Sequence, residues 1–312
     1  MLGAGLGTRL RPLTDDRPKP LVPLFDRPLV TLAFAHLAAA GVQEFVVNTH
    51  HLPEAWSVFT CGPNEQAEWQ GLPIALRHEP VLLDTGGGIK NCNDLLEGGD
   101  FWVHNGDVLA DLDLQSLWRE HTEQRNVVTL GLRSFGGPLH VAFDPPSGRV
   151  VNIRGELGAA AAAIPCLYTG IAVVSPAIFS WIPAGRPVSI IPVLLDLIRA
   201  GERVGGKILD EGTWMDLGSI AAYKAAHWKL LKGPTLRTVE NGWPRAMAAS
   251  AVLEEEVELA GENVIGEGCR IGRGARLINC ILWPGAEVAA GAHLKDCIVR
   301  RFAAGSMQSA IS

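Results

Sequence analysis

The chain has 312 residues, of which 47% are hydrophobic and 19% charged, and a formal net charge of −6. This composition is typical of a globular α/β protein and excludes a disordered chain, and the acidic balance argues against nucleic acid as a partner. The six cysteines show no CxxC pair and no metal-ligand spacing, which favours reduced thiols. Without a membrane-length apolar run or an export signal, we expect a cytoplasmic protein with no membrane partner.

Helices and strands alternate through the first two thirds of the chain. Apolar spacing, serine or aspartate caps and terminal glycines predict the helices, and short apolar runs predict the strands. The expected helices are 31–41, 114–124 (capped by Asp113), 189–201 and 219–232, and the expected strands are 44–48, 101–109, 126–133 and 169–175. Strands that alternate with helices of this length predict a doubly wound α/β sheet.

The pattern changes after Lys232. Apolar residues recur six apart at Ile265, Ile271 and Leu277, and the series continues after one slip. The segments LINCIL and LKDCIV repeat at a separation of 17, and a six-residue period with glycines predicts a β-helix. The expected organisation is a domain over 1–232, a linker over 233–256, a hexapeptide β-helix over 257–301 and a tail over 302–312.

The opening stretch GAGLGTRLRPLTDDRPKPL (residues 3–21) combines closely spaced glycines with three fixed cations. Glycines let backbone N–H groups approach a ligand, and the cations require a dense anion, so the phosphates of a nucleotide are the first candidate. The stretch is neither a Walker loop nor a Rossmann G-x-G-x-x-G, because its glycines run G-x-G-x-G and no Gly-Lys-Ser/Thr follows.

The run 8–12 (TRLRP) and the later run 18–21 (PKPL) resemble the G-x-G-T-R-L-x-P…P-K-P-L motif of sugar-1-phosphate nucleotidyltransferases. The C-terminal repeat resembles that of mannose-1-phosphate guanylyltransferases and ADP-glucose pyrophosphorylases. The resemblance covers nearly the whole chain. It implies a Rossmann-like mixed sheet (the nucleotidyltransferase fold), a short left-handed β-helix, and an NTP and a sugar 1-phosphate as substrates. Two or three coils leave both ends of the β-helix to be covered, one by the catalytic domain and the other either by a second subunit, which would give a homo-oligomer, or by the tail over 302–312.

Four residues are the candidates for catalysis. Arg9, a forked cation, suits the departing β- and γ-phosphates, and by resemblance Lys19 contacts the α-phosphate. Asp107 follows VHNG in the Gly-Asp turn at the carboxyl end of the strand predicted over 101–109, and Asp216 lies in TWMDLG, which resembles the family's W-x-D-x-G. The two aspartates are the predicted ligands of Mg²⁺. For Arg11, a surface role and a ligand contact stay equally open.

Two further sets of residues are candidates for substrate binding. The nucleotide set is Gly3, Ala4, Gly5, Gly7, Thr8, Gly86, Gly87 and Gly88, and the last three are expected in a glycine-rich loop (79–91) that opens a helix. The sugar-phosphate set is Asn105, Gly106, Arg154, Thr169 and Gly170. The triple glycine resembles N-acetylmuramate-1-phosphate uridylyltransferases and some heptose-phosphate guanylyltransferases, whereas the β-helix favours mannose-1-phosphate guanylyltransferases. GTP with mannose 1-phosphate is the first candidate pair, and UTP with N-acetylmuramate 1-phosphate or another hexose 1-phosphate is the alternative.

The sequence departs from the family in two places. Many members hold the sugar phosphate with a lysine before the T-G strand, but here no lysine lies between Lys90 and Lys207. Either Arg154 is the substitute, or the metal and other residues hold that anion. Only Met1 and Leu2 precede the glycine loop, where a buried strand is expected, and we therefore predict a start codon further upstream. These departures leave open a catalytically weak regulatory or scaffold homologue.

Overall fold

A computed structural model describes residues 1–61, 66–158, 163–233, 236–239, 242–301 and 309–311. The chain forms two compact units, each assembled from separate stretches of sequence. The first unit comprises Met1–Leu6, Pro18–Pro20 and Ala33–Asp216, and the second comprises Gly7–Arg17, Leu21–Leu32 and Leu217–Ser312. The predicted domain boundaries stay predictions, and most of the predicted tail lies outside the described residues.

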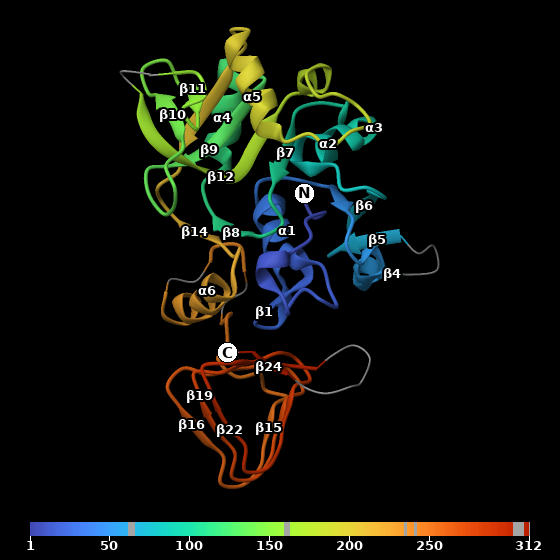
Figure 1. Ribbon diagram of the computed structural model, residues 1–312, viewed down its shortest axis with the longest axis vertical. Coiled ribbons are helices and arrows are strands. Elements are labelled where there is room, and N and C mark those ends of the chain that lie inside the picture. Colours follow the sequence, from blue (N-terminus) through green and yellow to red (C-terminus); the bar gives the residue numbers. More distant parts are fainter. Residues whose placement is uncertain (62–65, 159–162, 234–235, 240–241, 302–308, 312) are drawn as a thin grey trace. The chain divides into compact units, whose positions relative to one another are not determined.

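A six-stranded mixed sheet forms the core of the first unit (Figure 1). Its order is β10 (Val141–Asp144), β11 (Arg149–Ile153), β13 (Val204–Ile208), β9 (Val128–Arg133), β12 (Ile164–Val174) and β7 (Phe101–His104). Every residue of β9 is buried, as expected for a strand covered on both faces. Apolar residues of α5 (Ile190–Arg199) belong to this core, and α4 (Leu114–Gln124) contacts β9 and β13.

A smaller sheet of four strands lies in the same unit. Its order is β3 (Phe45–Thr49), β6 (Leu72–His78), β5 (Gln66–Trp69) and β4 (Thr60–Cys61). Leu2 forms parallel bridges both to Asn48, in β3, and to Asn105, just after β7. A single residue therefore connects the edges of the two sheets.

The mixed α/β fold is confirmed, but its strand directions differ from a doubly wound sheet. Among the described strands of the first unit, only β9–β13 and β3–β6 pair in parallel. The strand predicted over 101–109 is two strands, because a turn at 105–107 separates β7 from β8 (Val108–Asp111). The second of these pairs antiparallel with β14 (Thr213–Asp216), so residue 107 lies at a corner of the chain.

The predicted helices form within two residues of their expected ends. Their serine and aspartate caps are also in place: Asp113 accepts the Ser116 N–H at 3.1 Å, and Ser219 accepts that of Ala222 at 3.2 Å. The remaining helices are α1 (Leu29–Ala39), α2 (Asp84–Asn91), α3 (Asn93–Leu96), α6 (Ile220–Lys232) and the 3₁₀ turns η1 (Thr8–Leu10), η2 (Lys19–Leu21), η3 (Pro53–Phe59) and η4 (Pro176–Ser180). Within the described ranges, no helix has the length and apolarity that crossing a membrane requires.

The second unit holds the repeat (orange to red in Figure 1) and the short strands β1 (Pro23–Leu24) and β2 (Arg27–Pro28). The repeat forms three parallel sheets, in which each strand pairs with one 17 or 18 residues further along the chain. The sheets are β15 (Val252–Leu253), β18 (Arg270–Ile271) and β21 (Glu287–Val288); β16 (Glu258–Ala260), β19 (Arg276–Ile278) and β22 (His293–Lys295); and β17 (Val264–Ile265), β20 (Ile281–Leu282) and β23 (Ile298–Arg300), with β24 (Ser309–Ile311) antiparallel at the end.

The apolar period of the repeat forms a core of its own. Ile265, Ile271 and Leu277 are buried there, with Leu282 and Val288 from the next coil. Each of these side chains stacks on its counterpart one coil away, because the parallel register places Ile271 beside Val288 and Leu277 beside Leu294. The predicted six-residue spacing therefore marks the inward-pointing position of each short strand.

A buried arginine attaches the N-terminal segment of this unit to the repeat. The guanidinium of Arg300, in β23, is fully buried and donates to the Asp16 carboxylate at 2.6 Å and to the Pro12 carbonyl at 2.7 Å. Two charge-assisted bonds offset the cost of removing this cation from water. The segment that follows the opening glycines is thus held by a residue almost three hundred positions further along the chain.

Candidate active site

A cavity of about 470 Å³ in the first unit brings together six of the predicted site residues. They are Gly3, Ala4, Gly5, Lys19, Asn105 and Asp107. The cavity is also lined by Leu82, Asp84 and Thr85, at the start of α2. The opening glycines, the lysine between prolines and the turn after β7 therefore converge in space, although more than 80 residues separate them in sequence.

The two charged members of this group form an ion pair. The Nζ atom of Lys19 lies 2.5 Å from Oδ2 of Asp107, and the lysine side chain is only 10% exposed. Pro18 and Pro20 restrict the backbone on both sides of the lysine. A cation that is largely removed from water and bonded to a carboxylate is held in one place, and this is what alignment of a phosphate requires.

Asp107 and Asp216 are neighbours through the pairing of β8 with β14. Asp216 stands opposite Val108, the residue directly after Asp107. Asp216 is exposed and Asp107 is partly exposed, so both carboxylates are accessible to a ligand. No cluster of three or more acidic, histidine or cysteine ligands occurs within the described part of the chain. The predicted metal site therefore has two protein carboxylates, which the tertiary pairing brings to adjacent positions.

A buried pair, Asn48 and Glu79, connects the two walls of the cavity. Asn48 Oδ1 accepts the Gly3 N–H at 2.8 Å, and its Nδ2 donates to Glu79 Oε1 at 2.7 Å. The other Glu79 oxygen accepts the Leu83 N–H at 2.9 Å, just before α2. Glu79 is fully buried, and each carboxylate oxygen has a donor. Neither residue was predicted from the sequence. The available signal was Asn48 itself, a polar residue at the end of an apolar strand.

Two glycines of the site permit close crossing of the chain. A Cβ atom on Gly3 would lie 2.9 Å from the Asn48 carbonyl oxygen, and one on Gly106 would lie 2.7 Å from that of Leu2. Both contacts are with backbone, which has little freedom to move away. These glycines are therefore required by the packing around the cavity, in addition to any contact with a ligand.

Gly86, Gly87 and Gly88 lie inside α2 and are buried, whereas the sequence analysis expected a loop that opens the helix. A Cβ atom on Gly86 would lie 2.9 Å from the Val188 carbonyl oxygen, and one on Gly88 would lie 2.8 Å from Glu79 Oε1. The glycines allow the helix to pack against the backbone around Val188 and against the Asn48–Glu79 pair. The residues that line the cavity are those at the start of the helix, Asp84 and Thr85.

A second cavity of about 210 Å³ adjoins the first and contains Arg154. The two cavities share four lining residues, Leu2, Asp84, Thr85 and Asn105. Tyr168 and Ser189 also line the second cavity, and burial raises the pKa of Tyr168, which keeps its phenol uncharged. Arg154 is exposed in a turn, and within the described ranges no residue forms a hydrogen bond or ion pair with its guanidinium. A cation therefore lines a cavity that shares four of its lining residues with the first.

The remaining predicted sugar-phosphate residues have roles in the sheet. Gly170 has φ = +79°, and a Cβ atom there would lie 2.6 Å from Asn105 Nδ2. Its carbonyl accepts the Asn105 N–H at 2.9 Å, so Gly170 positions Asn105 in the cavity. Thr169 is fully buried, and its hydroxyl donates to the Gly131 carbonyl at 2.8 Å. A role for Thr169 in sugar binding stays a prediction.

Gly7, Thr8 and Arg9 belong to the second unit. Gly7 has φ = +65° and its carbonyl accepts the Thr14 hydroxyl at 2.9 Å, which shapes the turn that begins η1. Arg9 is exposed. Its contact with the phosphates that leave the reaction stays a prediction.

The chain is similar to known proteins over most of its length. The family model described as Nucleotidyl transferase matches residues 1–136. The chain is 30% identical to mannose-1-phosphate guanylyltransferase of Mycobacterium tuberculosis, over 96% of this chain and 82% of the relative. It is 31% identical to N-acetylmuramate alpha-1-phosphate uridylyltransferase of Neisseria meningitidis, over 72% and 95%. A solved UDP-glucose pyrophosphorylase from Acinetobacter baumanii has a similar fold, with a TM-score of 0.63 at 18% identity over 76% and 94%.

The family model and these relatives, together with the fold, define a nucleotidyltransferase. The chain belongs to the nucleotidyl transferase family. This confirms the enzyme class that the opening motif predicted, a sugar-1-phosphate nucleotidyltransferase.

Proposed function

We propose that the protein transfers GMP from GTP to mannose 1-phosphate and releases pyrophosphate. An oxygen of the sugar phosphate attacks the α-phosphorus, and the bond from that phosphorus to the oxygen bridging the β-phosphate breaks. The observation that carries the proposal is the cavity in which Lys19, Asp107 and the opening glycines meet. The guanylyltransferase relative, which this chain matches over 96% of its length, supports the choice of substrates.

In this proposal the protein catalyses mainly by alignment and charge neutralisation. Backbone N–H groups of the opening glycines approach the triphosphate, and Lys19 stabilises the negative charge that rearranges at the α-phosphate. Arg9 neutralises the departing pyrophosphate. Asn48, which itself lines the cavity, and the buried Glu79 act as positioning residues, because they fix Gly3 and Leu83.

Asp107 and Asp216 fit a magnesium ion by the chemistry of their donor set. Mg²⁺ takes oxygen ligands and is commonly held by one or two carboxylates together with water and substrate phosphates. Two accessible carboxylates at adjacent positions, without histidine or cysteine, meet that requirement. When bound, the ion would supply Lewis-acid stabilisation of the phosphate charges.

The sugar phosphate is assigned to the second cavity, with Arg154 as its cation. This assignment rests on the exposed guanidinium and on the residues that the two cavities share. It is tested by Arg154→Ala, with Arg119→Ala on the exposed face of α4 as the control. The Michaelis constant for the sugar phosphate should rise at least ~10-fold for the first variant only, while that for the NTP stays the same. An unchanged constant for the sugar phosphate would reject the assignment.

UTP with N-acetylmuramate 1-phosphate, or with another hexose 1-phosphate, is the second candidate pair. The uridylyltransferase relative favours it, together with the triple glycine of α2. Pyrophosphate release from each NTP with each of several sugar 1-phosphates, in the presence of Mg²⁺, separates the candidates. Turnover with a single pair identifies the substrates. No turnover with any pair would favour the regulatory homologue.

We also propose that the three C-terminal sheets form a left-handed β-helix of the hexapeptide type and that this segment mediates homo-oligomer formation. The 17-residue register and the buried apolar period support the first part. Exposed apolar side chains on the strands of the repeat, Val252 and Leu259, support the second. Light scattering of the full chain and of a Leu259→Glu variant tests it, and equal masses would contradict a contact at this position.

A further inference from the structure

Asp84, the first residue of α2, has a strained backbone in the wall of two cavities. Its φ is +59°, a left-handed conformation that glycine adopts freely and that is costly for most residues with a side chain. Its side chain is exposed, and it lines both the first cavity and the second. Backbone strain of this kind gathers at functional sites. A carboxylate at this position therefore calls for a role that glycine could not fill.

Hydrogen bonds on both sides of Asp84 hold the strained residue in place. The Leu83 carbonyl accepts the Val188 N–H at 2.9 Å, and the Thr85 hydroxyl accepts the Ile190 N–H at 2.9 Å. These bonds attach the start of α2 to the segment that leads into α5. A conformation that its surroundings determine in this way persists in spite of its cost. The carboxylate is thus carried by a rigid part of the site.

One oxygen of the Asp84 carboxylate remains open to a ligand. Oδ1 accepts the Thr85 N–H at 2.6 Å, whereas within the described ranges no group donates a hydrogen bond to Oδ2 and no cation pairs with the carboxylate. A carboxylate without a cationic partner repels a phosphate group. The part of a substrate that lies beside Asp84 is therefore uncharged and offers hydrogen-bond donors.

The first cavity offers two kinds of surface to an NTP. Lys19 suits the triphosphate, as proposed above. Leu82 and Pro187 also line the cavity and provide apolar surface. Binding sites combine such apolar walls with a few polar groups that fix the orientation of the ligand, and the Asp84 carboxylate is a group of that kind. With the triphosphate at Lys19, the planar base is the part of the NTP that fits the apolar walls.

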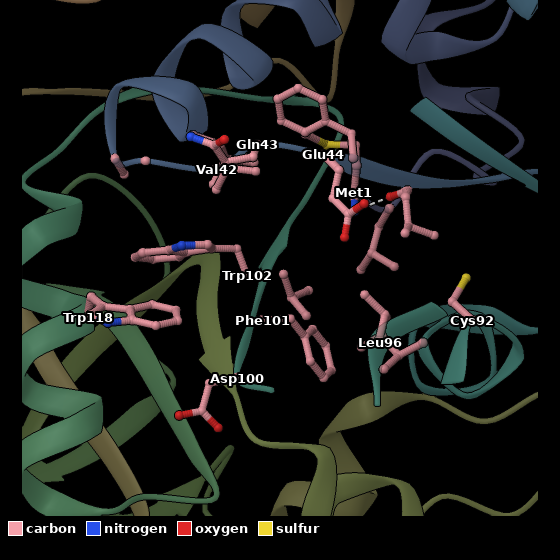
Figure 2. Close-up of a pocket in the computed structure, with 18 of the residues that line it drawn as sticks. Met1, Val42, Gln43, Glu44, Cys92, Leu96, Asp100, Phe101, Trp102 and Trp118 are labelled. Carbon is pink, nitrogen blue, oxygen red and sulfur yellow. Dashed lines mark hydrogen bonds between the residues drawn. The ribbon is translucent and has the colours of Figure 1, made fainter. Parts of the chain in front are cut away.

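A third cavity, of about 440 Å³, lies beside Met1 but does not suit an NTP (Figure 2). Figure 2 shows Trp102 and Trp118 together on one side of it, and aromatic rings are common partners of a base. The two rings pack against each other with centroids 5.5 Å apart, so no base fits between them. Its described lining residues include no lysine or arginine, so a triphosphate would meet neither of these cations there. The first cavity is therefore the better place for base recognition.

We propose that the Asp84 carboxylate selects guanine as the base of the NTP. One edge of guanine presents two neighbouring donors, N1–H and the N2 amino group, and a carboxylate accepts both in a bidentate pair. The corresponding edge of uracil places N3–H between two carbonyl oxygens, which a carboxylate repels. This role rests on the proposed function, because it assigns the group that reads the base of the same substrate.

Equilibrium binding of GTP, ITP and UTP, with Mg²⁺ and without sugar phosphate, tests this role. ITP differs from GTP only by the missing N2 amino group, so the native chain should bind GTP at least ~10-fold more tightly than ITP. Asp84→Gly removes the carboxylate and suits the positive φ, and it should bind GTP and ITP equally. Asp84→Asn presents a donor beside an acceptor and should lose most of the preference for GTP over UTP. Asp196→Asn, which changes an exposed aspartate of α5, should behave as the native chain.

A preference for GTP over ITP that is equal in the native chain and in both Asp84 variants would overturn the role of Asp84 and leave GTP as the substrate. Tighter binding of UTP than of GTP by the native chain would instead reject GTP itself, and with it a carboxylate that selects guanine. A third result, an unchanged affinity for every NTP with a raised Michaelis constant for the sugar phosphate, would place the carboxylate at the sugar and also overturn the role. The unfolding midpoint of each variant verifies its fold.

Discussion

Lys19 Nζ contacts Asp107 Oδ2 at 2.5 Å, and this ion pair joins the proline-flanked lysine to the turn after β7. Each partner has a different proposed role when substrates bind, the lysine at the α-phosphate and the aspartate at the metal. The ion pair therefore holds the lysine ammonium group and the aspartate carboxylate in position before substrates bind. Because Lys19 is largely buried, separation of the pair on binding requires a new partner for its charge, and a substrate phosphate would supply one.

Replacement of Lys19 tests its proposed catalytic role. Lys19→Ala should lower kcat for pyrophosphate release at least ~100-fold, because a donor directed at developing phosphate charge is typically worth that much. The fold should remain, and the unfolding midpoint checks this. Lys232→Ala is the matched control, since that side chain is 70% exposed in the second unit. If both variants kept full kcat, Lys19 would have no part in the reaction.

The metal role of Asp216 predicts a specific change in magnesium dependence. Asp216→Asn should raise the Mg²⁺ concentration for half-maximal rate on the order of tenfold, equivalent to ~1.4 kcal/mol of binding free energy. Titration of the rate with Mg²⁺ at saturating substrates measures it. Asp196→Asn, an exposed aspartate of α5, should leave the titration unchanged. Identical curves for the two variants would remove Asp216 from the metal site.

Glu79→Gln tests the buried connection between the cavity walls. Glutamine keeps only one of the two acceptor oxygens and places an NH₂ group where the other stood. Either Asn48 Nδ2 or the Leu83 N–H then meets a second donor, which should lower the free energy of unfolding by about 1–3 kcal/mol. Urea unfolding measures it. The Michaelis constant for the NTP should rise too, because Gly3 loses its fixed position. Glu97→Gln, which changes an exposed bond to Asn93, should alter neither quantity. A loss of stability with an unchanged Michaelis constant would limit Glu79 to a structural role.

Gly170→Ala separates backbone strain from contact with the site. A left-handed conformation costs an L-residue about 1–2 kcal/mol, and Gly201→Ala carries the same strain in open space. The Cβ at position 170 meets Asn105 in addition, so only this variant should also raise the Michaelis constant for the sugar phosphate. Unfolding and steady-state kinetics of both variants provide the comparison. An equal kinetic effect in the two would contradict a positioning role for Gly170.

The buried histidines His104 and His227 predict a loss of stability below pH 6.5. Burial lowers the pKa of His104 to about 3 and that of His227 to about 4, so acid favours the unfolded state, in which both are protonated more readily. His227→Asn should reduce the loss between pH 6.5 and pH 4, and His293→Asn, on an exposed position of β22, should not. Urea unfolding at several pH values checks both variants.

Local sequence determined the enzyme class, most helices with their caps, and the inward positions of the C-terminal repeat. These features depend on residues close together in the chain: PKPL, Asp113 before a helix, and an apolar residue at every sixth position. The 17-residue separation of LINCIL and LKDCIV is also the register of the paired strands, because equal coils place equal residues side by side.

Only the tertiary structure decided how the site is held together. The partners of Lys19 and of Asn48 lie 88 and 31 residues away, and no local pattern specifies which carboxylate each will meet. The three glycines of α2 appeared as a ligand loop because glycine permits many conformations, whereas close packing around Asn48 and Glu79 gave them a helical one.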